Sequence, residues 1–240
     1  MISTGFSKGS KSFAQPRIIG GIIAPADSIL HQFNVVVISG TDKGKYQCGG
    51  TLISPNYVLT AAHCCKDETI NKKPETATLK DPLNEKKDKT YKISKVIIHP
   101  KFDMKTFSPN LPTLSLYDFA ILRLDTPAQS NKFFPCLPKH NTDMHVGANG
   151  TASGWGQAEM MKKQPSKVLK SAQVTVISNM QCAKSLLESY GMKIPLITLK
   201  PLIDGGYFNF LICADGKKTK SAACYGDSGG RFLKNSDIYF

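Results

Sequence analysis

Short runs of apolar residues recur along this chain and are separated by loops rich in Gly, Pro, Asn and Lys. Such runs predict β-strands, and their regular recurrence is typical of an all-β sandwich or barrel. Residues 179–190 depart from this pattern, because their apolar side chains recur at helical spacing and predict a single helix. The predicted strands are 34–39, 50–54, 57–60, 91–98, 120–124, 168–177 and 210–214.

The predicted strands fall into two groups, five before residue 125 and two after residue 138. A Pro-containing stretch, residues 125–138, separates them and is typical of a connection, so we place a boundary near residue 130. The first 17 residues are polar, lack periodicity and end at Pro16-Arg17, which predicts a removable leader over 1–17. We expect one globular unit over 18–240, with halves of about 18–130 and 131–240.

Length and cysteine content narrow the class of protein. A chain of 240 residues with 41% hydrophobic content can bury a sizeable core, and the absence of a long apolar run predicts no membrane span. Seven cysteines at irregular spacing, without a CxxC pair, favour disulfides made in an oxidising, extracellular compartment. The N-terminal residues nevertheless lack the apolar stretch of a secretory signal. No His, Cys, Asp or Glu group has metal-ligand spacing, so we expect no metal and no cofactor.

The formal net charge of +13 comes from lysine clusters in loop-like contexts. Solvated loops that maintain solubility are the favoured interpretation, and steering toward heparin-like polyanions, nucleic acid or anionic membranes is the second. No aromatic interleaving or nucleic-acid motif accompanies the lysines, so we expect no specific nucleic-acid partner. The clusters lie at residues 72–73, 86–89, 162–163 and 217–220.

Three segments carry residues suited to nucleophilic catalysis. His63 follows the predicted strand 57–60, Asp118 opens the strand 120–124, and Ser228 lies in a glycine-rich segment, Gly226 to Gly230. A serine hydroxyl needs a base to take its proton and a third group to orient that base. The same glycine-rich turn can supply an oxyanion hole through the backbone N–H groups of Gly226 and Ser228. We therefore predict a triad of His63, Asp118 and Ser228.

Each segment alone has a structural alternative, because Gly-Asp-Ser-Gly also forms turns, His-Cys is often structural and an Asp before a strand is often a cap. Their order, His then Asp then Ser, differs from that of subtilisins and of α/β-hydrolases. Together the segments resemble the chymotrypsin/trypsin-like serine endopeptidase family from Ile18 to about Lys234.

This resemblance implies a fold and a reaction. The fold is all-β, with two perpendicular six-stranded antiparallel β-barrels and the triad in the cleft between them. In the reaction, His63 is the general base, Asp118 orients it, and Ser228 forms an acyl-enzyme with the carbonyl of a protein or peptide substrate.

Residues 16–21 resemble the zymogen activation site of the family, with cleavage after Arg17 by a trypsin-like protease. The resemblance implies that the new α-amino group of Ile18 inserts beside Asp227, next to the oxyanion hole. A buried carboxylate without such a cation is costly to keep ionised, so the leader is expected to keep the enzyme inactive until it is cut.

The resemblance also implies two disulfides, Cys48–Cys64 beside the catalytic histidine and Cys182–Cys213 around the predicted helix. It assigns no partner within the chain to the remaining cysteines, which are Cys65, Cys136 and Cys224.

Ala222 stands where the family places the residue at the base of the primary specificity pocket. Trypsin-like members have Asp there, so alanine favours a small or apolar substrate side chain over Lys or Arg.

Two further segments have family or motif associations. Residues 84–89 lie near the calcium loop of some relatives, but lysines crowd the segment, so we expect no calcium there. Asn149-Gly150-Thr151 is a glycosylation sequon and also a tight-turn signal, of which we favour the turn.

The sequence departs from the family after Ser228. Arg231 replaces the expected proline, and the chain ends at Phe240, so we expect the second barrel to be incomplete. The alternative to an endopeptidase is therefore a non-catalytic homologue or truncated fragment that binds partners without turnover. The intact triad favours the enzyme.

Overall fold

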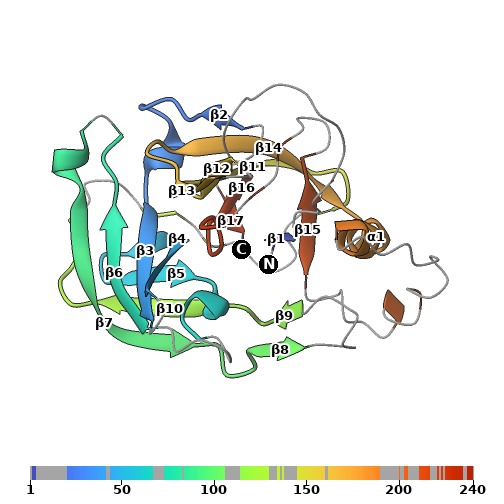
Figure 1. Cartoon of the computed structure of the whole chain (residues 1–240), viewed down its shortest axis with the longest axis horizontal. Coiled ribbons are helices and arrows are strands. Elements are labelled where there is room, and N and C mark those ends of the chain that lie inside the picture. Colours follow the sequence, from blue (N-terminus) through green and yellow to red (C-terminus); the bar gives the residue numbers. More distant parts are fainter. Residues whose placement is uncertain are drawn as a thin grey trace.

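The structure is a computed structural model of the chain (Figure 1). It describes residues 2–3, 21–41, 44–66, 73–82, 84–105, 114–129, 134–135, 137, 145–159, 162–189, 200, 203–204, 211–216, 221, 223, 225–234 and 237–239.

Short strands dominate these residues, which confirms the prediction of a mainly β fold. In chain order the strands are β1 (Ile2–Ser3), β2 (Ile22–Ile23), β3 (Asn34–Thr41), β4 (Gly44–Ser54), β5 (Tyr57–Thr60), β6 (Lys73–Leu79), β7 (Lys89–Ile98), β8 (Asp103–Lys105), β9 (Leu114–Leu116), β10 (Ala120–Leu124), β11 (Asn149–Gly154), β12 (Gln157–Glu159), β13 (Lys162–Pro165), β14 (Lys170–Ile177), β15 (Ile212–Asp215), β16 (Phe232–Lys234) and β17 (Asp237–Tyr239). The predicted helix is α1 (Asn179–Ser189), and three 3-10 turns are η1 (Ile29–His31), η2 (Ala62–Cys64) and η3 (Glu85–Lys87).

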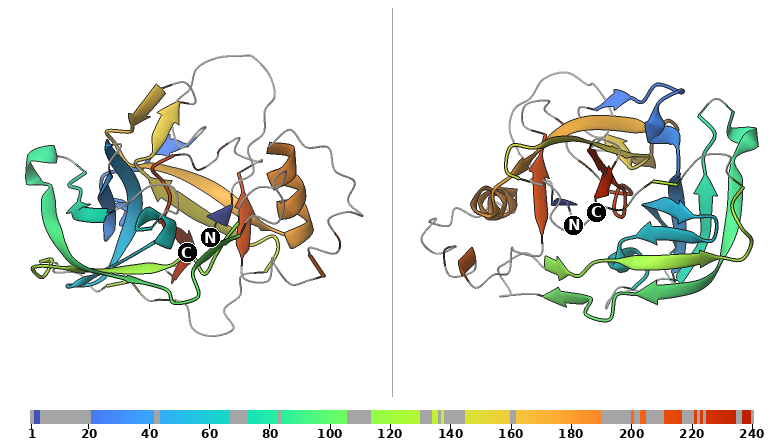
Figure 2. Two further views of the ribbon diagram at one scale, coloured as in Figure 1. Left: turned by 60° about the horizontal axis from the view of Figure 1, so that its bottom comes forward. Right: turned by 180° about the vertical axis from the view of Figure 1, so that it is seen from behind.

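Six strands of the first half form a closed antiparallel barrel in the order β10-β5-β4-β3-β6-β7. Alternate residues of these strands point inward, as the period of two along a strand requires. The centre of its core is fully buried and consists of Val37, Val58 and Leu122, with Leu52 and Val35 beside them. The barrel is the blue-to-green side of Figures 1 and 2, whereas α1 lies at the opposite edge of the molecule.

The second half is a seven-stranded sheet with the order β1-β15-β14-β11-β16-β17, and β2 pairs with β14. Its core contains Val174, Val176, Ala214 and Phe232. Two strands come from the N-terminal part of the chain, where sequence predicted none: β1 pairs parallel with β15, Ile2 opposite Ile212, and β2 pairs with β14. These two-residue strands are too short to carry a hydrophobic pattern.

The turn predicted at Asn149-Gly150 is wrong. Both residues belong to β11, in which Asn149 pairs with Thr175 and Gly150 with Val174 of β14. Glycine is required here by packing, because a Cβ at Gly150 would clash with the ring of Phe232. The glycine therefore makes room for a core aromatic side chain and does not mark a chain reversal.

Two small sheets, β8-β9 and β12-β13, extend from these larger sheets. Within the described residues, the structure contains no helix with the length and apolar character that a membrane span requires.

Candidate active site

His63 is presented by the tight turn η2 that follows β5. Backbone bonds from Cys64 N to Ala61 O (3.2 Å) and from Cys65 N to Ala62 O (2.8 Å) close the turn. Ala62 and Cys64 on either side of the histidine are almost completely buried, whereas the His63 side chain is 26% exposed. The buried neighbours anchor the turn, so the imidazole is held at the surface of the barrel.

Asp118 lies just before β10, and its side chain is 2% exposed. Its Oδ2 is 2.6 Å from His63 Nδ1, and its Oδ1 accepts the His63 backbone N–H at 2.7 Å. A carboxylate can only accept, so the Nδ1 atom carries a hydrogen and Nε2 of a neutral ring is left as a proton acceptor. The pair therefore fixes both the orientation and the tautomer of His63.

The residue before Asp118 has an unusual backbone. Tyr117 adopts a left-handed φ of 52°, and Phe119 N donates to Tyr117 O at 2.7 Å. The Tyr117 ring stacks on His99 with centroids 5.1 Å apart and planes at 5°. Because non-glycine residues rarely adopt this conformation, the stack helps to hold a sharp bend that turns Asp118 toward His63.

Ser228 lies in a glycine-rich loop that is pressed against the first barrel. Ser228 O accepts from Gly49 N of β4 at 2.7 Å, and Gly230 N donates to Asp227 O at 2.9 Å to close a turn. Gly226 and Gly229 have positive φ values of 92° and 77°. A Cβ at Gly229 would lie 2.7 Å from Gly49 O and would also clash with Thr60, so glycine is required there.

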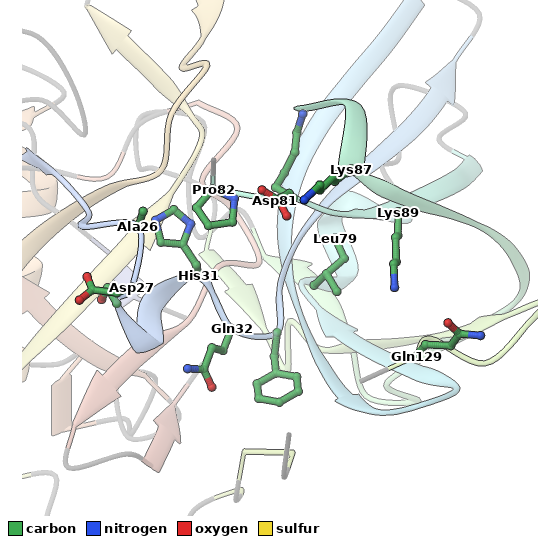
Figure 3. A pocket seen from close by; sticks show the side chains of 13 residues that line it. Ala26, Asp27, His31, Gln32, Leu79, Asp81, Pro82, Lys87, Lys89 and Gln129 are labelled. Atoms are coloured by element: carbon green, nitrogen blue, oxygen red, sulfur yellow. The ribbon is translucent and has the colours of Figure 1, made fainter. Parts of the chain in front are cut away.

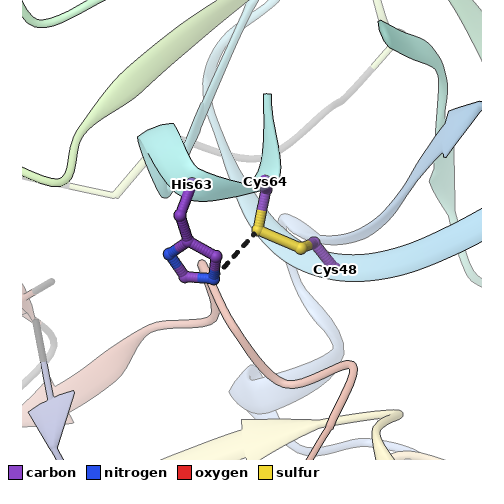
Figure 4. A group of neighbouring side chains, drawn as sticks. All are labelled: Cys48, His63 and Cys64. Atoms are coloured by element: carbon purple, nitrogen blue, oxygen red, sulfur yellow. Dashed lines mark hydrogen bonds between the residues drawn. A yellow bond between two sulfur atoms is a disulfide. The ribbon is translucent and has the colours of Figure 1, made fainter. Parts of the chain in front are cut away.

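The Cys48–Cys64 disulfide joins the histidine turn to β4 beside this loop. The Cys64 sulfur lies 3.7 Å from His63 Nε2 (Figure 4). It also lies 3.7 Å from Ser228 O, so it contacts both halves of the site. Cys48, His63 and Cys64 place their ligand atoms within 4.8 Å of one another. Both sulfurs are engaged in the disulfide and cannot act as thiolate ligands, so this cluster does not suit a metal.

Asp227, next to Ser228, is 8% exposed. Its Oδ1 accepts from Gly156 N at 2.7 Å. Gly154 and Gly156 create the space for this carboxylate, because a Cβ at either position would clash with it. The buried carboxylate is therefore packed against Gly154 at the end of β11 and against Gly156.

The structure brings His63, Asp118 and the Ser228 loop together at the junction of the barrel and the second sheet. The second disulfide, Cys182–Cys213, ties α1 to β15. Several predicted positions lie outside the described residues, namely Arg17, Ile18, Cys136, Ala222 and Cys224.

Sequence reasoning missed several residues that support the loop. Thr60 Oγ1 donates to Gly49 O at 2.8 Å, and Gln47 Nε2 donates to Trp155 O at 3.0 Å across the junction. Arg231, three residues after Ser228, is buried and bonds to the η1 segment. Polar residues inside strands, such as Thr60 and Gln47, give no periodic signal in the sequence. Arg231 could have been noticed because it stands where the family has proline.

A separate pocket of about 490 Å³ opens between the η1 segment and the loop after β6 (Figure 3). His31, Gln32 and Asp27 line one side, and Lys87 and Lys89 line the other. None of its lining residues belongs to the triad or to the Ser228 loop.

Comparisons with known proteins find similarity over most of the chain. The trypsin family model matches residues 18–239. Trypsin 5G1 of Aedes aegypti is 29% identical over 92% of this chain and 73% of that protein. Kallikrein-1 of Mus musculus is 29% identical over 91% of this chain and 76% of that protein, and granzyme A of Bos taurus is 32% identical over 80% and 66%.

A solved structure supports the fold. Neuropsin, a serine protease expressed in mouse brain, matches with a TM-score of 0.61 and 24% identity over 88% of this chain and 82% of that one.

Proposed function

Because the chain belongs to the trypsin family of serine proteases, we propose that it is a serine endopeptidase that hydrolyses peptide bonds through an acyl-enzyme. The observation that carries this proposal is the pair of hydrogen bonds by which buried Asp118 holds His63, at 2.6 and 2.7 Å, beside the Ser228 loop. Burying an ionised carboxylate costs free energy. A surface histidine without a function would not need such a carboxylate to hold it.

In the proposed reaction the Ser228 hydroxyl attacks the substrate carbonyl while His63 Nε2 takes its proton. The imidazolium that forms is stabilised by Asp118, and the oxyanion is stabilised by the backbone N–H groups of Gly226 and Ser228. His63 then donates the proton to the leaving amine. Water next attacks the acyl carbonyl while His63 takes a proton from it, and His63 returns that proton to Ser228 Oγ as the bond between Oγ and the acyl group breaks. Each proton transfer uses groups already present in the chain.

Activation by cleavage after Arg17 is part of the proposal. The buried, glycine-lined position of Asp227 supports it, because an inserted Ile18 ammonium would compensate a carboxylate adjacent to the oxyanion hole. The activator would be a trypsin-like protease. An Arg17→Gln chain is expected to stay inactive after trypsin treatment that activates the wild type, and equal activity of the two would contradict this mode of activation.

Specificity and localisation are proposed from one residue and from the two disulfides. Ala222 stands at the sequence position where the family places the base of the specificity pocket, and this supports a preference for small or apolar substrate side chains, which a peptide library would test. The two disulfides support action outside the cell, since cytosolic thiols are kept reduced.

The decisive experiment is labelling of the purified chain, cleaved after Arg17, with a fluorophosphonate that reacts with activated serines. Ser228→Ala is the matched control. Labelling that disappears in the control supports the endopeptidase. A folded wild-type chain that does not label would refute it and favour the non-catalytic homologue that binds partners without turnover.

A second proposal concerns an exposed basic face on the first barrel. We propose that it binds a linear polyanion such as a heparin-like chain. Lys92 and Lys95 lie on β7, and Lys95 stands directly opposite Arg123 of β10. All three are exposed, and none forms a salt bridge in the part of the chain that the structure describes. Like charges opposite each other destabilise a sheet, so a bound polyanion would relieve their repulsion.

Heparin-column chromatography tests this surface. A variant with Lys92, Lys95 and Arg123 changed to Gln is expected to elute at lower salt than a control with the same charge change. The control changes three exposed lysines elsewhere, Lys45, Lys66 and Lys167. Elution of both variants at the same salt would show that only total charge matters.

A further inference from the structure

Arg231 is a buried cation immediately behind the Ser228 loop. It is 2% exposed, and burial lowers its pKa to about 10. Its Nη2 atom donates to two backbone carbonyls of η1, Ile29 O at 3.0 Å and Leu30 O at 2.9 Å. These contacts join residues about two hundred positions apart in the sequence, with separations of 202 and 201.

The contacts continue into a network that crosses from the barrel to the second sheet. Leu30 O also accepts from Asn34 Nδ2 at 3.0 Å, and the same Nδ2 lies 2.9 Å from Ser153 Oγ. Asn34 opens β3 of the barrel, whereas Ser153 belongs to β11 of the sheet. Arg231 therefore belongs to a buried polar seam between the two halves of the molecule.

The seam does not need Arg231 to satisfy its carbonyls. Ile29 O also accepts from Gln32 N at 3.0 Å, and Leu30 O keeps Asn34. Among the described residues no carboxylate bonds to the guanidinium, and its Nε has no hydrogen-bond partner. Burying an unpaired charge is costly, so stability alone does not explain an arginine here.

Its place in the chain suggests another explanation. The proposed base and its carboxylate come from the barrel, whereas Ser228 comes from the loop that leads into β16 of the sheet. The distance between base and nucleophile therefore depends on how firmly the loop is fixed to the barrel. Gly49 holds Ser228 itself, and Arg231 holds the chain three residues later.

We propose that Arg231 is a positioning residue that fixes Ser228 against His63 by tying the end of the nucleophile loop to the η1 carbonyls. This inference rests on the proposed function. A displacement of about 1 Å can lower the rate of an enzyme about 100-fold, so a loosened loop should be visible in kinetics.

Arg231→Met is the main test, because methionine keeps an unbranched apolar stem and removes the charge and its donors. Arg231→Lys keeps the charge on a single ammonium. Lys167→Met, at an exposed position, is the control for loss of one positive charge. For each activated variant, the measurements are the second-order rate of fluorophosphonate labelling, kcat and KM for a peptide substrate, and Tm.

We expect Arg231→Met to label about 10- to 100-fold more slowly, with kcat lowered, KM nearly unchanged and Tm not reduced. Arg231→Lys should recover part of the rate, and Lys167→Met should match the wild type. Labelling of Arg231→Met at the wild-type rate would overturn the proposal, as would a loss of rate explained entirely by the unfolded fraction at the assay temperature. A wild-type chain that does not label would instead refute the proposed function, and this inference with it.

Discussion

Changing Asp118 to asparagine would remove one buried charge and leave the size of the side chain nearly the same. The asparagine oxygen can still accept the His63 backbone N–H, now accepted at 2.7 Å by Oδ1. The other contact, 2.6 Å to Nδ1, would face an amide nitrogen that can only donate. His63 would then hold its proton on Nε2, the atom that must accept the serine proton.

The size of the effect follows from these two contacts. A hydrogen bond to a charged group contributes about 1.5–3 kcal/mol. At 1.36 kcal/mol for each factor of ten, losing the Nδ1 contact alone predicts a rate about 10- to 160-fold lower. The wrong tautomer adds to this, and the same change in Ser-His-Asp triads typically lowers kcat about 10⁴-fold. We therefore expect a loss above about 160-fold that approaches about 10⁴-fold.

The assay is kcat for a peptide substrate, together with the rate of fluorophosphonate labelling, on the activated chain. Asp125→Asn, at an exposed position after β10, is the matched control and should retain wild-type rates. Tm should change little for Asp118→Asn because the backbone contact remains. A kcat within tenfold of the wild type would refute the reasoning, since it would mean that the carboxylate does not set the tautomer of His63.

Three further predictions concern stability. Leu122→Ala empties the centre of the closed barrel and should cost about 2–5 kcal/mol in urea unfolding; a cost below about 1 kcal/mol would contradict the packing described. Gly150→Ala forces a methyl group into the Phe232 ring and should lower the free energy of unfolding by about 1–3 kcal/mol in the same assay. An unchanged free energy of unfolding would show that β11 and β16 can move apart. Because burial lowers the pKa of Arg231 to about 10, below its ordinary value, the folded state releases this proton before the unfolded state does, and stability should rise with pH above about 10. The stability difference between Arg231→Met and wild type should therefore narrow as pH rises through that value, and a constant difference would contradict the burial of a charged guanidinium.

The sequence predicts the barrel better than the sheet for a physical reason. β5 and β10 alternate buried and exposed side chains, so their pattern marks them, and β10 is found at its predicted bounds. β11 contains Asn149-Gly150, whose local chemistry favours a turn, and only the distant ring of Phe232 explains the glycine. Such tertiary requirements leave no periodic mark in the neighbouring residues.

In the candidate site too, residues in short motifs could be predicted from the sequence, whereas contacts between distant segments could not. His63 and Asp118 could be named from short motifs, and the structure places them in direct contact. The contacts that fix the Ser228 loop could not be named, because Gly49 acts through its backbone and Arg231 reaches carbonyls about two hundred residues away. Backbone donors carry no residue type, and pairings between remote segments have no local signature in a single sequence.

The sulfur of Cys64 also links the proposed catalysis to the redox state of the surroundings. While Cys64 is bonded to Cys48, its sulfur has no hydrogen to donate, and it lies 3.7 Å from both His63 Nε2 and Ser228 O. Reduction of the disulfide would leave a thiol at Cys64, close to the proposed base His63. A thiol is more acidic than a serine hydroxyl. That thiol would compete with the Ser228 hydroxyl as a hydrogen-bond donor to His63 Nε2. A reducing compartment is therefore expected to slow the proposed reaction by supplying a rival hydrogen-bond donor, even if the fold survives.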